Sequence, residues 1–130
     1  MRQSYNFEPL PVEDIISTGI ITTAIRLGIT QKEEGVWECE EAEYNHKDAL
    51  TEADYGPMVS AIIRARYSQD QVEAITQNYL ADPDGHRTEF DELQAWRAVA
   101  KTTASDIIRD AISRWVSSAG WCGSGTVSRL

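Results

Sequence analysis

The feature that most constrains the fold is an apolar pattern between Thr51 and Ser118, which recurs at intervals of three and four residues. This spacing gathers apolar side chains on one face of an α-helix, where they are buried together. The pattern has three sections, whose members are Tyr55, Met58, Val59, Ile62 and Ile63; Val72, Ile75, Tyr79 and Leu80; and Phe90, Leu93, Trp96, Ala100, Ala104, Ile107, Ala111 and Trp115. Residues 51–118 are therefore predicted to be helical.

Capping and turn residues divide this segment into separate helices. Thr51 is followed three residues later by Asp54, and Ser68 is followed three residues later by Gln71. This is the spacing at which a capping residue and the third helical residue satisfy each other's backbone N–H groups. The segment Asp82-Pro83-Asp84-Gly85 has the composition of a turn. These signals predict helices that begin near Thr51, near Ser68 and after Gly85.

The third helical section leaves one question open. Two threonines and the Ser105-Asp106 pair weaken its centre, because their side chains compete for backbone hydrogen bonds. Residues 86–118 therefore form either one long helix or two helices that meet near Ser105. Ala100 and Ala104 are small enough to let another element approach closely.

The segment before the helices shows the period of a β-strand. Residues 21–30 place Ile21, Ile25 and Leu27 on one side and polar or small residues on the other. Residues 31–35 are polar and end in glycine, as a hairpin loop does. Residues 36–44 then form the partner strand, and their glutamates predict an exposed edge of the sheet.

The first residues are harder to assign. Pro9 and Pro11 favour extended backbone, so residues 1–11 are predicted to be an extended arm. Residues 13–18 form either a short helix or an earlier strand.

These elements predict an α+β protein with an N-terminal antiparallel β-hairpin followed by a bundle of three to four helices. A chain of 130 residues supports one domain. We expect a single domain over 1–118, with the arm at 1–11, the hairpin region at 12–44 and the helices at 51–118. Residues 119–130 are expected to be a flexible tail.

The net charge of −9 disfavours nucleic-acid binding, which relies on clustered Lys and Arg. Residues 31–54 hold nine acids and two lysines. This cluster is a solvated face, a docking surface for a basic partner or a cation site. No apolar stretch is long enough to cross a bilayer, and no signal peptide is recognised. Cys39 and Cys122 are expected to be reduced thiols, which fits an intracellular setting.

The motifs of common enzymes are missing from the sequence. His46 and His86 are the only histidines, both are expected in surface loops, and no nucleophile elbow accompanies them. Gly85 is the fourth residue from Asp82, whereas a calcium loop of the EF-hand type requires glycine at the sixth position. Gly120 to Gly125 lacks the lysine of a phosphate-binding loop. We expect no catalytic residue, no cofactor and no metal.

The most distinctive segment runs from Ile63 to Ile75 and contains Arg64-Ala65-Arg66-Tyr67-Ser68, an Arg-x-Arg-Tyr-Ser element. Together with Glu89 to Gln94, Arg97, Ala100 and Lys101, it resembles small uncharacterised proteins of phages and prophages of Bacteroidetes, encoded near tail and virion genes. The resemblance covers roughly Tyr55 to Ala104. It implies an accessory protein of the virion, the tail fibre or its assembly, and it carries over no catalytic residue.

The expected function is that of a non-enzymatic phage accessory or virion structural protein, a tail, fibre or head component that acts through protein–protein contacts. The alternatives are a phage assembly chaperone and, from another class, a small enzyme or ligand-binding regulator. The expected partners are other phage structural proteins and further copies of the chain, without nucleic acid or membrane. The expected location is the virion or the host cytoplasm.

The possible interaction surface comprises Arg64, Arg66, Tyr67, Trp96, Trp115 and Trp121. The Arg-x-Arg-Tyr-Ser element also has a structural explanation, in which Tyr67 closes one helix and Ser68 caps the next. Both explanations remain open at the level of sequence.

Overall fold

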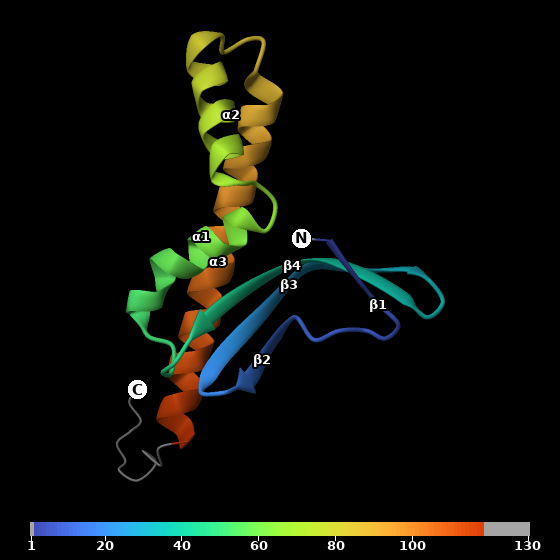
Figure 1. Cartoon of the computed structure of the whole chain (residues 1–130), viewed down its shortest axis with the longest axis vertical. Helices are drawn as coiled ribbons and strands as arrows, with labels where there is room; N and C mark the ends of the chain where they lie inside the picture. The colour runs from blue at the N-terminus through green and yellow to red at the C-terminus, as the bar shows by residue number, and fades with distance from the viewer. Residues whose placement is uncertain (1, 119–130) are drawn as a thin grey trace.

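The computed structural model describes the backbone of residues 2–118 and the side chains of residues 2–114. It shows an α+β fold, as predicted: a four-stranded antiparallel sheet followed by three α-helices (Figure 1). The elements are β1 (Arg2–Tyr5), β2 (Val12–Ser17), β3 (Ile20–Glu33), β4 (Val36–His46), the short 3-10 helix η1 (Glu52–Asp54), α1 (Tyr55–Arg64), α2 (Gln69–Ala81) and α3 (Arg87–Ser118). The expected tail at 119–130 lies outside the described residues.

The sheet has the strand order β1-β4-β3-β2, which corrects two expectations and decides an alternative that the sequence left open. The arm at 1–11 contains a strand, since β1 pairs with β4 from Arg2↔Glu40 to Tyr5↔Trp37. Of the two alternatives for residues 13–18, the earlier strand is the one that forms, so the hairpin region at 12–44 contains three strands. The charged strand β4 is interior rather than at an edge, because β1 covers its outer side.

The β3–β4 hairpin contains two glycines in left-handed backbone. Gly35 has a φ of 78° and closes the turn between the strands. Gly28 has a φ of 64° and lies where the register shifts between Leu27 and Thr30. The predicted alternation therefore holds from Ile21 to Leu27 and is then interrupted by this irregularity.

The predicted helix starts are confirmed. Thr51 caps η1 and forms a capping box with Asp54, and α1 follows directly from Tyr55. Ser68 forms a second capping box with Gln71 at the start of α2. The third section is one continuous helix of 32 residues without a break near Ser105.

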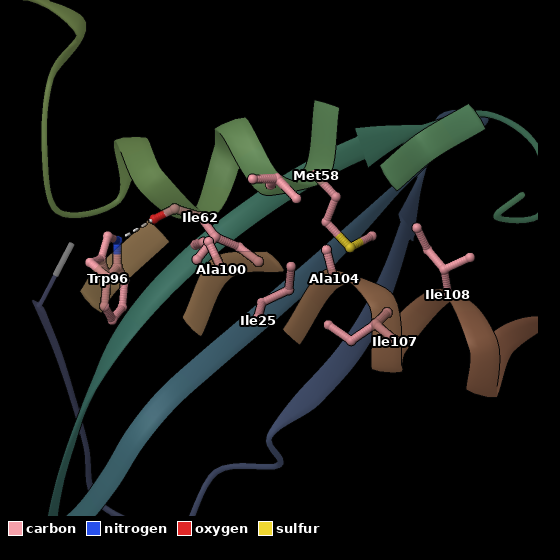
Figure 2. Packing of buried hydrophobic residues seen from close by; sticks show 10 residues of the cluster. Ile25, Met58, Ile62, Trp96, Ala100, Ala104, Ile107 and Ile108 are labelled. Carbon is pink, nitrogen blue, oxygen red and sulfur yellow. Dashed lines mark hydrogen bonds between the residues drawn. The ribbon is translucent and has the colours of Figure 1, made fainter. Parts of the chain in front are cut away.

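Helices α1 and α3 cover one face of the sheet and enclose the core (Figure 2). Met58 and Ile62 of α1 are fully buried, as are Ala100 and Ala104 of α3. The two alanines leave room for α1 to lie close to α3, as expected. Ile25 of β3 completes this layer at 1% exposure. The burial of such side chains is the main stabilising contribution to the fold.

Helix α2 differs from the expected bundle. It packs mainly against α3, while α1 packs against both α3 and β4. Figure 1 shows α2 and the first part of α3 extending together away from the sheet. No residue of α2 is buried, although Tyr79 stacks on Phe90 of α3 with ring centroids 3.9 Å apart. The three helices therefore do not enclose a common core, and α1 and α2 each pack against α3.

The opposite face of the sheet is organised around Arg26, because side chains alternate between faces along β3. The Arg26 side chain is only 6% exposed and forms ion pairs with Glu41 at 2.8 Å and with Glu13 at 2.9 Å. It also donates to the Leu10 carbonyl at 3.0 Å and to the Tyr5 hydroxyl at 3.3 Å. This group, which we call the Arg26 cluster, joins residues from all four strands.

The Arg26 cluster shifts the pKa values of its members. Burial alone would lower the pKa of Arg26, but its hydrogen bonds to Glu41, Glu13 and Tyr5 outweigh this and raise the pKa. The hydrogen bond to Glu41, together with burial, raises the pKa of the Tyr5 hydroxyl. The guanidinium is therefore permanently charged and the phenol neutral at physiological pH.

Replacing Arg26 with leucine should destabilise the fold by about 3 kcal/mol, because Glu41 would be left largely buried without its cation. Chemical denaturation followed by circular dichroism measures this change. Arg2→Gln is the matched control, since Arg2 forms exposed pairs with Glu38 and Glu40 that should contribute less than about 1 kcal/mol. Equal effects of the two variants would contradict the role given to Arg26.

Candidate functional site

The junction between α1 and α2 has the structural role expected for it. The Tyr67 N–H donates to the Ile63 carbonyl at 2.9 Å and closes the end of α1. The Ser68 hydroxyl accepts from the Gln71 N–H at 3.1 Å, and the Gln71 side chain accepts from the Ser68 N–H at 2.7 Å. The Arg-x-Arg-Tyr-Ser element is thus a helix end followed by a helix cap. Its two arginines, Arg64 and Arg66, have different neighbours.

Trp96 is packed within the fold, and Arg66 lies against it while its side chain stays 43% exposed. Trp96 is 6% exposed, and its indole N–H donates to the Ile62 carbonyl at 3.0 Å (Figure 2). The Arg66 guanidinium lies 3.9 Å from the centre of the Trp96 ring and 3.4 Å from a carboxylate oxygen of Glu40. The predicted interaction residue Trp96 therefore offers little free surface, because its ring is covered by its own chain.

Arg64 lines a small polar hollow on another side of the junction. The hollow measures about 200 Å³ and lies where α1, α2 and α3 meet. Its lining residues are Ser60, Ile63, Arg64, Tyr67, Gln69, Val72 and Arg97. We call this feature the arginine hollow. Sequence reasoning included Arg64 and Tyr67 but missed Arg97, which joins them from α3.

A larger apolar groove follows the loop before α1. It consists of two adjoining hollows of about 660 and 490 Å³, which share Glu52 and Ile112. Tyr55 and Ile112 are partly exposed there. The predicted interaction residues Trp115 and Trp121 cannot be assigned to this groove, because the side chain of Trp115 and the whole of Trp121 lie outside the described residues.

The outer edge of β2 is the most exposed apolar strand in residues 2–114. Ile16 is 73% exposed, Ile15 47% and Val12 38%. Charged residues on an edge strand usually prevent pairing with another chain. Here both acids of β2 are engaged inward, because Glu13 pairs with Arg26 and Asp14 accepts from the Thr23 hydroxyl at 2.8 Å.

A histidine and a hydroxyl meet at the end of the sheet without forming an accessible site. His46 ends β4 rather than lying in a loop, and its Nε2 lies 2.8 Å from the Thr23 hydroxyl. Its Nδ1 lies 2.8 Å from the Asp48 carbonyl. The Thr23 side chain is fully buried, so a substrate cannot approach its hydroxyl. His86, the other histidine, pairs with Glu89 at 2.9 Å.

Three of the nine acids of residues 31–54 form ion pairs with cations of the described chain. Glu38 pairs with Arg2 and Lys32, Glu40 with Arg66, and Glu41 with Arg26. In the described part of the chain, no group of three His, Cys, Asp or Glu side chains is arranged to hold a metal ion. Cys39 is a buried free cysteine, as predicted, and burial raises the pKa of its thiol. Cys122 lies outside the described residues.

A short hydrogen bond joins the end of the sheet to the first helical turn. The Tyr44 hydroxyl donates to Asp54 at 2.6 Å, and the other oxygen of Asp54 accepts from the Thr51 N–H at 2.8 Å. Burial and this bond raise the pKa of Tyr44 to about 12. Burial alone would raise the pKa of Asp54, but the hydrogen bonds from Tyr44 and Thr51 outweigh it and lower the pKa.

Replacing Tyr44 with phenylalanine should raise the pKa of Asp54 toward its ordinary value and cost about 1 kcal/mol at neutral pH. Because the folded pKa of Asp54 is lowered, its contribution to stability is full above about pH 4 and is lost as the pH falls through the folded pKa. NMR titration of the carboxyl group and urea unfolding at pH 7 and pH 3 measure both effects. Tyr55→Phe is the control, and a Tyr44→Phe variant with unchanged Asp54 titration would contradict the assignment.

Within residues 2–118, no helix combines the length and apolar character needed to cross a membrane. Comparison of the chain with protein-family models, curated proteins and solved structures gave no match.

Proposed function

We propose that the protein is a non-enzymatic component that acts through protein–protein contacts and associates with further copies of itself through β2. The exposed outer edge of β2 is the observation that carries this proposal. The resemblance of residues 55–104 to phage and prophage proteins supplies the setting, an accessory or structural protein of the virion (a tail, fibre or head component). Other phage structural proteins are then the partners of the assembled form.

The hydrogen-bonding pattern supports β2 as a template for a further strand. The Arg26 N–H donates to the Pro11 carbonyl at 2.8 Å, which makes Pro11 and Arg26 a hydrogen-bonded pair. Because such pairs alternate along an antiparallel ladder, the N–H groups of Val12, Asp14 and Ile16 point away from β3. An added strand would satisfy these groups, which is the general mode of β-strand addition.

A second copy of β2 fits this edge in a favourable register. A two-fold axis through Ile15 places Ile15 opposite its own copy and Asp14 opposite Ile16. The N–H groups that point outward then meet carbonyls, and no two carboxylates face each other. A register centred on Asp14 would oppose two carboxylates, which is destabilising. The arrangement joins two sheets into one, and such a two-fold contact is the commonest kind among homo-oligomers.

The alternative function, a phage assembly chaperone, is favoured by a different surface. Helix α2, its turn and the first part of α3 form an arm over residues 69–95, which carries seven acids and one arginine, a net charge of −6. Figure 1 shows this arm projecting from the rest of the molecule. Charge complementarity would favour rapid but salt-sensitive binding of a basic partner, as transient masking requires.

Replacing Ile16 with glutamate tests the proposal, because the register described above would place this new carboxylate opposite Asp14 of the second copy, which is destabilising. The unmodified protein should form dimers or larger assemblies in light scattering after size exclusion, and Ile16→Glu should be monomeric. Leu80→Glu is the matched control, since Leu80 on α2 is 74% exposed, against 73% for Ile16, and lies far along the chain from β2. It should associate as the unmodified protein does.

The result that would overturn self-association through β2 is a strict monomer at all concentrations, or equal assembly of all three proteins. Mass spectrometry of purified virions then separates the two roles. A structural protein is present in the particle, whereas an assembly chaperone is absent from it.

A further inference from the structure

The arginine hollow brings together two cations from different helices. Arg64 is in the last turn of α1, and Arg97 is in the first half of α3. Both line the same hollow, along with the polar residues Ser60, Tyr67 and Gln69. None of the lining residues is acidic.

Neither arginine has an ionic partner among the described residues. No ion pair within 4.0 Å involves Arg64 or Arg97, whereas Arg2, Arg26 and Arg66 each pair with a glutamate. Neither arginine has an acid three or four residues away on its own helix, where helical ion pairs form. Two unpaired arginines around one hollow are a notable arrangement in a chain with 21 acids and 12 basic residues.

The acids nearest to the hollow have other contacts. Glu73 of α2 accepts from the Gln69 side chain at 3.2 Å. Glu41 and Glu43 border a separate hollow on the sheet side of Arg64. Glu41 is already paired with Arg26 at 2.8 Å, and neither acid reaches within 4.0 Å of Arg64. Arg64 and Arg97 are therefore available to bind an anion from solution.

The start of α2 adds to the positive character of this hollow. Gln69 is the first residue of α2 and lines the hollow, so the N-terminal end of the helix is adjacent to both arginines. The first N–H groups of a helix carry partial positive charge. The Gln71 N–H is already used by the Ser68 cap, whereas the N–H groups of Gln69 and Asp70 have no intrahelical acceptor.

We propose that the arginine hollow binds one small oxyanion, either a phosphate group or a carboxylate. The guanidinium groups of Arg64 and Arg97 supply forked donors that match the oxygens of both anions. A volume of about 200 Å³ accommodates one such group. The bound anion would bridge α1 to α3 at the base of the arm. This site is independent of the β2 edge, so a finding that the hollow binds no anion would leave the proposed self-association untouched.

Titration of the isotope-labelled full chain with sodium phosphate, followed by NMR, tests this proposal. Sodium chloride at matched ionic strength is the reference for screening, and sodium acetate is a second arm that represents carboxylates. Phosphate or acetate should produce saturable changes in the chemical shifts of the Gln69 and Asp70 amide signals and of the Arg97 side-chain N–H signal. The tighter of the two anions identifies the source, a phosphate group or a carboxylate.

Arg97→Gln should weaken the binding of that anion about 10-fold or more, because it removes charge-assisted hydrogen bonds. Lys101→Gln is the matched control, since it removes the same charge one turn further along α3 outside the hollow and should change affinity less than about 3-fold by screening. Arg64→Gln serves as a second variant, and circular dichroism verifies folding of each. Shifts that fail to saturate with either anion, or equal weakening by Arg97→Gln and Lys101→Gln, would overturn the site.

Discussion

The buried guanidinium of Arg26 is the interaction on which the sheet depends. A buried cation is costly unless several acceptors surround it, and Arg26 has Glu13, Glu41, Tyr5 and the Leu10 carbonyl. These acceptors come from β1, β2, β4 and the segment between the first two strands. The requirement to satisfy one charge therefore explains how the four-residue strand β1 and the chain around Pro9 are held to the sheet.

The same cluster has a consequence at the surface. Glu13 pairs with Arg26 and Asp14 accepts from Thr23, so both acids of β2 are held by β3 and are less free to protect this edge of the sheet than unpaired charges would be. Ile15 and Ile16 remain exposed there. The interaction that stabilises one face of the sheet thus leaves an apolar edge, and the proposed association of copies follows from it.

Local signals in the sequence predicted the elements whose formation is local. Thr51 and Ser68 marked the helix starts because a capping box lies within four residues, and the turn at Asp82–Gly85 separated α2 from α3. The sheet order was not predictable in this way. The pairing of Arg2 with Glu40 joins residues far apart in the chain, and nothing in the pattern of β4 alone shows that β1 covers it.

In the candidate sites, too, the local features could be predicted from the sequence and the long-range contacts could not. The sequence indicated that Arg64 to Ser68 is distinctive, and its helix-end geometry followed from the cap. The sequence could not show that Arg66 would lie over Trp96 near Glu40, or that Arg64 and Arg97 would line one hollow, because both arrangements depend on where α3 passes. The absence of acids around Arg97 on its own helix was the available signal for that residue.

Amide hydrogen exchange along β2, measured at two protein concentrations, tests the central claim of association through this edge most directly. The N–H groups of Val12, Asp14 and Ile16 point outward, whereas those of Glu13, Ile15 and Ser17 already face β3 and serve as internal references. Association predicts that the outward amides become protected as the concentration rises, while the inward amides change little. Outward amides that exchange equally fast at both concentrations, in a protein that light scattering shows to be assembled, would contradict it.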